Sequence, residues 1–175
     1  YTLGENRYAF SVSRNNPERF ITFTASPFNW IDATIFYVDI TGKEYGSGFN
    51  QSYKDKGFNL KISPFKLLDH NFAIGFNDMA GTGLFRSEYL AFSRSFYNFN
   101  YTFGIGWGAY NNGIAFNNPL IKINKSFETR PKDFTGRGGK FETDNYFSGS
   151  DASVFFAAGY KITQNTVLEF ELDPT

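Results

Sequence analysis

The amino-acid sequence predicts an all-β protein, and within that class an antiparallel transmembrane β-barrel of about nine strands that is part of a larger barrel or chain. Three observations predict this fold. Apolar side chains alternate with small or polar ones, aromatic residues make up 21% of the chain, and short connections alternate with long ones. Because successive side chains of a strand point to opposite faces, such alternation indicates a sheet whose two faces meet different surroundings.

The clearest strand is predicted at residues 99–108. Its apolar face carries Phe99, Tyr101, Phe103 and Trp107, whereas its other face carries Asn, Thr and three glycines. If both faces packed into a core, both would need large side chains to fill the space. The small residues on one face instead suit the crowded, curving interior of a barrel. The other strands are predicted at 7–13, 21–26, 31–40, 58–63, 72–77, 86–94, 153–161 and 168–173, and no helix is predicted.

The predicted connections differ in length in a regular way. Short ones lie at 27–30, 64–71, 95–98 and 163–165, and long loops lie at 41–56 and 109–151. Short turns at one end and long loops at the other are typical of a membrane-spanning barrel. On this basis the first strand is expected to start at the periplasmic side.

Two architectures are compatible with the alternation. A soluble β-sandwich or lipocalin-like barrel would bury the apolar face, whereas an outer-membrane barrel would turn it to lipid. The aromatic residues on one face, the glycines on the other and the unequal loops favour the membrane barrel. An odd strand number and the turn-like end Asp173-Pro174-Thr175 indicate that residues 1–175 form one barrel segment of a longer chain, or that a partner closes the sheet.

The composition excludes several classes of function. The chain has no Cys and a single His, which excludes disulfide frameworks, Cys-ligated metals and multi-His metal centres. No cofactor or metal is therefore predicted. A net charge of zero argues against nucleic-acid binding, which depends on neutralising phosphates. No apolar run reaches the roughly 18 residues of a membrane helix.

Six short sequences carry a family resemblance. They are SYKDKGF at 52–58, GTGLFRSEYL at 81–90, NFNYTFGIGWG at 98–108, FNNPL at 116–120, GGKF at 138–141 and YFSG at 146–149. With these sequences in this order, residues 7–173 resemble the YjbH family of exopolysaccharide-biosynthesis outer-membrane proteins, which includes the group 4 capsule secretion proteins. The first three sequences are the specific ones.

The resemblance implies a location and a process. Family members are outer-membrane β-barrel proteins of Gram-negative bacteria, several times longer than this chain, and the chain resembles their amino-terminal barrel portion. An outer-membrane location and a part in exopolysaccharide or capsule secretion are therefore expected. The family offers no catalytic motif to transfer.

A basic stretch in the loop 109–151 is the first candidate site. It contains Lys122, Lys125, Arg130, Lys132, Arg137 and Lys140 against two acidic residues, a net charge of +4. Such a stretch could attract an acidic polysaccharide, since a charged constriction concentrates counter-ions. The favoured alternative is a solvated loop, or one that touches anionic lipopolysaccharide.

Two carboxylates on one predicted strand are the second candidate. Glu169 and Glu171 share a face, at a spacing near that of paired glycosidase carboxylates. The favoured alternative is a polar lumen face, balanced by lysines such as Lys61. Aromatic residues outside the predicted strands, among them Tyr110 and Tyr146, could stack on sugar rings or form an interfacial belt.

The sequence thus predicts a non-enzymatic outer-membrane conduit or scaffold for exopolysaccharide or capsule secretion. Its expected partners are membrane lipid or lipopolysaccharide, an anionic polysaccharide and other envelope secretion proteins, without nucleic acid. The alternatives are a soluble, secreted carbohydrate-binding β-sandwich and, third, a glycan-modifying enzyme that uses Glu169 or Glu171.

Overall fold

In the part of the chain that the structure describes, eleven strands form one antiparallel sheet. The computed structural model describes residues 2–44, 51–81, 83–110, 114–130 and 145–172. The long strands follow one another in space as β1 (Arg7–Arg14), β2 (Glu18–Phe28), β3 (Ile31–Glu44), β4 (Ser52–Ile62), β6 (His70–Asn77), β7 (Ser87–Phe96), β8 (Phe99–Gly108), β10 (Asp151–Lys161) and β11 (Val167–Leu172). Short β5 (Lys66–Leu67) pairs with β6, and β9 (Ala115–Asn117) pairs with β10.

The predicted all-β antiparallel fold is confirmed, and each of the nine predicted strands corresponds to one long strand. The predicted loop 41–56 is wrong in its bounds, because β3 continues to Glu44 and β4 begins at Ser52. The register shifts between Ile40 and Glu44, and this irregularity hides the continuation from a search for alternation. The loop 109–151 contains β9 and two 3₁₀ helices, Pro119–Lys122 and Lys125–Phe127, which were not predicted.

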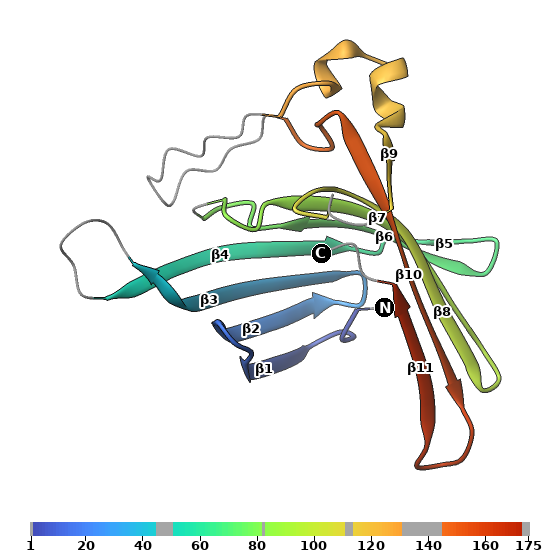
Figure 1. The fold of residues 1–175 in the computed structure, drawn as a ribbon. Helices are drawn as coiled ribbons and strands as arrows, with labels where there is room; N and C mark the ends of the chain where they lie inside the picture. Colours follow the sequence, from blue (N-terminus) through green and yellow to red (C-terminus); the bar gives the residue numbers. More distant parts are fainter. Residues whose placement is uncertain (1, 45–50, 82, 111–113, 131–144, 173–175) are drawn as a thin grey trace.

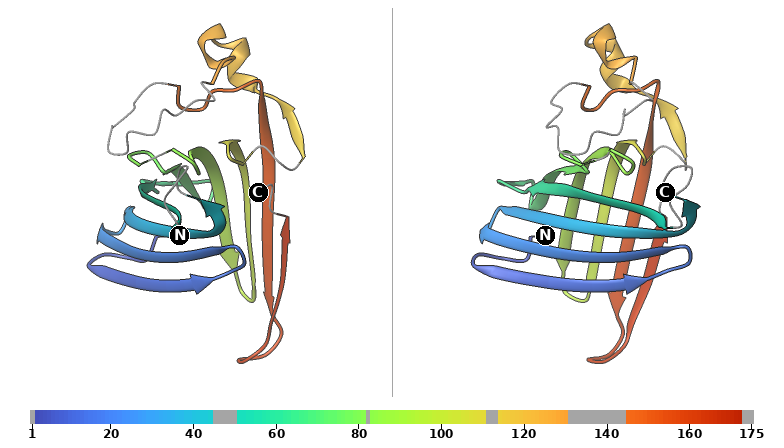
Figure 2. Two further views of the ribbon diagram at one scale, coloured as in Figure 1. Left: turned by 60° about the vertical axis from the view of Figure 1, so that its left-hand side comes forward. Right: turned by 90° about the vertical axis from the view of Figure 1, so that its left-hand side faces the viewer.

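The sheet bends strongly, so that β1–β4 lie across from β8, β10 and β11 while β6 and β7 connect the two groups (Figure 1; Figure 2). The strand order starts at β1 and stops at β11, and these two strands do not pair with each other in the described residues. The sheet is therefore open in the part of the chain that the structure describes.

The convex face of the sheet is apolar and exposed. The register aligns apolar partners across it, for example Phe10 with Phe23 and Phe92 with Phe103. The exposed fraction is 68% for Phe10 and 43% for Phe103, and 61% for Phe170 on β11. A continuous apolar surface thus crosses the sheet from β1 to β11, and we call it the apolar face.

The opposite, concave face is polar, and we call it the polar face. Hydroxyl groups pair across neighbouring strands, with 2.8 Å between the Oγ1 atoms of Thr24 and Thr34. An ion pair joins Lys61 Nζ to Asp32 Oδ2 at 2.8 Å. All described strands belong to one sheet, whereas a β-sandwich would have two packed sheets.

Glycines of the polar face lie beneath aromatic rings of neighbouring strands. Gly104 pairs with Phe155, and a Cβ added at Gly104 would stand 2.1 Å from the Phe155 ring. Gly75 pairs with Tyr89, and a Cβ there would stand 2.0 Å from that ring. The glycines, which were expected to suit a crowded, curving interior, make room for aromatic rings that cover this face of the sheet.

A Gly104→Ala substitution is expected to lower the free energy of unfolding by about 1–3 kcal/mol, because the Phe155 ring must leave its place. Urea unfolding of the folded protein in detergent measures the loss. The double variant Gly104→Ala, Phe155→Leu should recover part of it, and an unchanged midpoint in the single variant would contradict the packing described here.

In the described residues, no helix combines the length and the hydropathy needed to cross a bilayer.

Candidate functional site

The structure places the sequence-predicted basic residues at different positions. Lys122 and Lys125 are exposed in the two 3₁₀ helices, and Arg130 lies against the start of β7. Lys132, Arg137 and Lys140 fall outside the described residues. The described members therefore do not form one cationic surface, and the polysaccharide contact of the exposed lysines stays a prediction.

Glu169 and Glu171 lie on β11 and are both exposed. Their register partners on β10 are Gly159 and Ala157, so both side chains belong to the polar face. Glu171 lines a hollow of this face together with Lys61. The structure thus brings Glu171, but not Arg130, to the surface where Lys61 lies.

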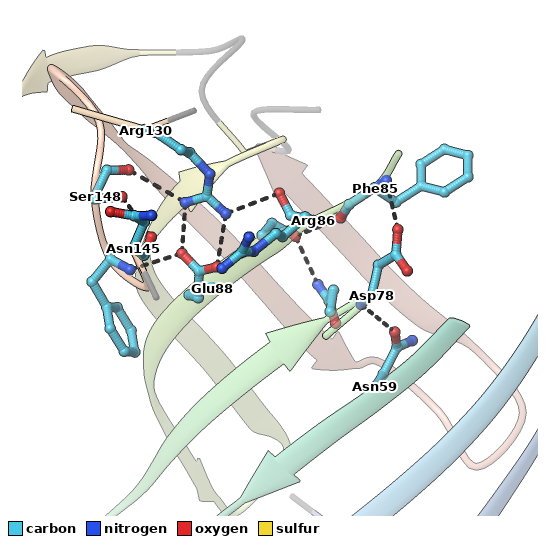
Figure 3. A network of polar contacts seen from close by, with 11 residues as sticks. Asn59, Asp78, Phe85, Arg86, Glu88, Arg130, Asn145 and Ser148 are labelled. Atoms are coloured by element: carbon cyan, nitrogen blue, oxygen red, sulfur yellow. Dashed lines mark hydrogen bonds and ion pairs between the residues drawn. The ribbon is translucent and has the colours of Figure 1, made fainter. Parts of the chain in front are cut away.

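A fully buried carboxylate, Glu88, lies at the start of β7 and accepts several hydrogen bonds there (Figure 3). Arg130 donates two hydrogen bonds to it, from Nη1 to Oε2 and from Nη2 to Oε1, each 2.7 Å long. The Phe147 backbone N–H donates a third, 2.9 Å long, to Oε2. A buried carboxylate is stable only when it is paired and hydrogen-bonded in this way. Glu88 therefore fastens two distant parts of the loop 109–151 to the sheet.

Asn118 provides a second fastening point for the same loop. Its Oδ1 accepts a hydrogen bond of 3.0 Å from the indole Nε1 of Trp107, which is 1% exposed. Its Nδ2 donates to the carbonyl oxygens of Phe127, Phe147 and Gly149. One side chain thus joins the end of β8 to both arms of the loop.

The loop packs against the apolar face at the strand ends. Glu88 and Trp107 are register partners, and Glu88 also pairs with Phe76. The ring of Phe147 contacts the rings of Phe76 and Trp107 edge-on, with centroids 5.6 and 5.2 Å away. We call Glu88, Trp107, Asn118, Arg130 and Phe147 the rim cluster. Because this cluster lies on the apolar face, residues 145–149 do not cover the polar face.

A further buried carboxylate, Asp78, shapes the connection between β6 and β7 (Figure 3). The Asp78 N–H donates to Asn59 Oδ1 at 2.9 Å, and the Phe85 N–H donates to Asp78 Oδ2 at 3.1 Å. Burial raises the pKa of the Asp78 carboxyl from 3.8 to about 7, and the nearby Asp55 adds to this, while the Phe85 N–H and Arg86 oppose it.

This pKa predicts a pH dependence of stability. Because the folded protein holds the Asp78 proton more tightly than the unfolded chain, Asp78 lowers the free energy of unfolding as the pH rises from 3.8 to about 7. Above that range its contribution is constant. Urea unfolding at pH 5 and pH 8 should show a smaller pH-dependent loss in Asp78→Asn than in the parent protein. If both proteins lost the same stability between pH 5 and pH 8, the raised pKa of Asp78 would be contradicted.

Three adjoining hollows of about 350, 270 and 350 Å³ lie along the polar face. All three share Asn77, and pairs of them share Asn59, Lys61, Tyr89 and Tyr110. We call this continuous depression the polar groove. Its walls present amide, hydroxyl, amine and carboxylate groups beside aromatic rings, so they can hydrogen-bond a polar ligand while packing against its apolar parts.

Sequence reasoning named Arg130 only as a member of the basic stretch and gave no role to the other residues of the rim cluster. Glu88 carried one usable signal, because it occupies an apolar-face position in line with Leu90 and Phe92. Its partner Arg130 lies 42 residues away in the sequence, so the pairing itself was not predictable. Asn118 lies within FNNPL at 116–120, which contributed to the family resemblance but did not indicate a role for its side chain. In the described residues, no group of three His, Cys, Asp or Glu side chains could hold a metal ion.

Comparisons with known proteins agree with the sequence resemblance. The model of the YjbH family, exopolysaccharide biosynthesis protein YbjH, matches residues 3–175. The uncharacterized lipoprotein YjbH of Escherichia coli (strain K12) is 29% identical over 166 residues, which are 90% of this chain and 23% of that protein. The chain thus spans less than a quarter of that relative's length. No solved structure matches it. With its family matched over nearly the whole chain, this protein belongs to the YjbH exopolysaccharide-biosynthesis family.

Proposed function

We propose that this chain is a segment of an outer-membrane β-barrel protein that acts in exopolysaccharide or capsule secretion as a conduit or scaffold, without catalysing a reaction. The observation that carries the proposal is the exposed apolar face, which crosses the sheet from Phe10 to Phe170 opposite a polar concave face. A bilayer requires this arrangement, because lipid covers the apolar side chains and a wet interior solvates the polar ones.

The family supports the process, since its description names exopolysaccharide biosynthesis. The relative from Escherichia coli supports an envelope location, since its name calls it a lipoprotein. Lipid, lipopolysaccharide, an anionic polysaccharide and other secretion proteins are the partners that such a location offers. The soluble β-sandwich is disfavoured, because a single sheet leaves the apolar face without a second layer.

The non-enzymatic part of the proposal rests on the two candidate carboxylates. Glu169 and Glu171 stand on the same exposed strand, whereas the paired carboxylates of glycosidases flank the scissile bond from two sides. A role in the polar lining of a conduit accounts for both side chains.

The membrane location is tested with the full-length protein that contains this chain. We expect it to float with lipid vesicles in a density gradient, to resist extraction by alkaline carbonate, and to aggregate when detergent is removed. A protein that stays monodisperse without detergent would exclude a lipid-facing Phe10 and Phe103 and would sink the proposal.

The secretion role is tested in cells that lack the gene. We expect less polysaccharide in the medium, and restoration by the Glu169→Gln, Glu171→Gln double variant as well as by the parent protein. Loss of secretion in the double variant, with normal folding and amount, would favour the enzyme alternative.

A further inference from the structure

The polar groove carries a second inference, which rests on the proposed function and specifies its ligand. Hollows that share Asn77 make the groove continuous, and its largest parts have volumes of about 350 Å³. Volumes of about 300–1,000 Å³ are typical of sites for small molecules. The groove is therefore large enough to hold part of a polymer chain.

One wall of the groove is aromatic. The rings of Tyr110 and Phe155 lie nearly parallel, at an angle of 27° with centroids 5.9 Å apart, and Tyr89 meets both edge-on. The Phe155 ring lies over Gly104, so a flat apolar surface adjoins the backbone. An aromatic surface of this kind can pack against the C–H face of a sugar ring.

Hydrogen-bonding groups line the groove beside these rings. Asn77 Nδ2 donates to the Tyr110 hydroxyl at 3.1 Å, which holds this ring beside the amide. Ser93 and Thr102 line the same hollow, and their hydroxyl oxygens lie 2.8 Å apart. Hydroxyl and amide groups both donate and accept hydrogen bonds, as the hydroxyl groups of a sugar require.

The charged side chains of the groove indicate whether it can bind neutral or acidic sugars. Among its described lining residues, Lys61 is opposed by Asp32, with which it forms an ion pair, and by Glu171. One positive and two negative side chains disfavour a polymer of uronic acids, because like charges in a confined space repel. The exposed Lys122 and Lys125 lie on the loop and not in the groove.

We propose that the polar groove binds an uncharged segment of a polysaccharide, with Tyr110 and Phe155 packing against sugar rings and Asn77 hydrogen-bonding their hydroxyl groups. Because Lys61 is balanced by Asp32, Glu171 gives the groove its net negative charge, which disfavours acidic sugars. Glu171 is thus a specificity-determining residue, and Tyr110 contributes ring contact as well as orientation.

Calorimetric titration of the full-length protein in detergent tests this. The probes are maltohexaose, cellohexaose, chitohexaose and an oligogalacturonic acid of equal length. We expect at least one neutral oligosaccharide to bind and the acidic one not to bind. Tyr110→Ala should weaken neutral binding roughly tenfold or more. Tyr110→Phe keeps the ring and should lose less.

Tyr97→Ala is the matched control, because Tyr97 is fully exposed in the turn between β7 and β8. It should bind as the parent protein does. Glu171→Gln should narrow the preference for neutral over acidic probes. A difference in gel mobility between heated and unheated samples shows whether each variant is folded. If Tyr110→Ala does not fold, the binding of the neutral probes is compared between Tyr110→Phe and the parent protein instead.

The results distinguish this inference from the proposed function. If the protein floats with vesicles but binds none of the neutral probes, the groove assignment is overturned and the barrel stands. Tighter binding of the acidic probe, or neutral binding that is unchanged in both Tyr110 variants, also overturns it. Failure to associate with vesicles would remove the proposed function itself.

Discussion

Arg130→Met is expected to destabilise the folded protein by up to about 3–5 kcal/mol, because buried Glu88 loses the guanidinium that donates two hydrogen bonds of 2.7 Å to it. Among the cationic side chains of the described residues, Glu88 then keeps only Arg86, whose Nε lies 3.9 Å from its Oε1. The Arg130 guanidinium also donates to the carbonyl oxygens of Arg86 and Ser148, and these contacts disappear with it. Removing one partner of a buried ion pair lowers the free energy of unfolding by far more than the intact pair contributes to it, because the remaining charge stays buried away from water. The effect should include release of residues 145–149 from the sheet.

Urea unfolding of the full-length protein in lipid vesicles measures this loss, and hydrogen exchange of the Phe147 amide reports the release of the loop. Lys125→Met is the matched control, because it removes a basic residue from the same loop at an exposed position. Its effect should stay within about 0.5 kcal/mol. The double variant Glu88→Leu, Arg130→Met should recover part of the stability, because it removes the buried charge but also takes the carboxylate away from the Phe147 N–H and from Arg86. Equal midpoints for Arg130→Met and Lys125→Met would show that the rim cluster is not held by this pair.

Phe103→Arg is expected to cost about 2–4 kcal/mol of folding free energy in a bilayer, the amount for a cation at the lipid-facing midplane of a barrel. Phe103 lies in the middle of β8, between Phe92 and Phe156 of the neighbouring strands, and it is 43% exposed. In lipid its replacement places a guanidinium against hydrocarbon. In water the same change would meet solvent and cost little.

Folding titrations into vesicles of short-chain and long-chain phosphatidylcholine measure the effect. It should grow with bilayer thickness, because a thicker bilayer leaves the charge less able to reach the interface. Tyr97→Arg at the exposed turn should be neutral in both lipids. A midpoint for Phe103→Arg that equals that of the parent protein in both would show that this side chain does not face lipid.

The strand positions were predictable because most of them follow from alternation alone. Residues 99–108 were predicted with their bounds intact, since Phe99 to Trp107 alternate without interruption. The end of β3 was missed where a register shift after Ile40 breaks the alternation. The start of β4 was missed because three consecutive charged residues, 54–56, interrupt the alternation of apolar and polar side chains there. Local pattern specifies a strand only as long as its two faces stay distinct.

The organising residues of the site were less predictable, because their roles depend on the three-dimensional fold. The basic stretch appeared uniform in sequence, yet Arg130 is bound to a carboxylate of β7 while Lys122 and Lys125 remain exposed. The roles of Tyr89 and Tyr110 depend on which strands meet at Asn77. Composition indicated that aromatic and amide groups were available, but not that they share one groove.

The spatial order of the long strands repeats their order in the chain. Each long strand pairs with the long strand before it in the chain, so most loops between partners are short and cost little closure entropy. The exception is the pair of β8 and β10, whose partners are separated by residues 109–150. Such a sheet can nucleate at one hairpin and grow by one strand at a time. Synthesis or delivery to a bilayer from one end would then add one strand at a time at the growing edge, while the edge at β1 also stays unpaired in the described residues.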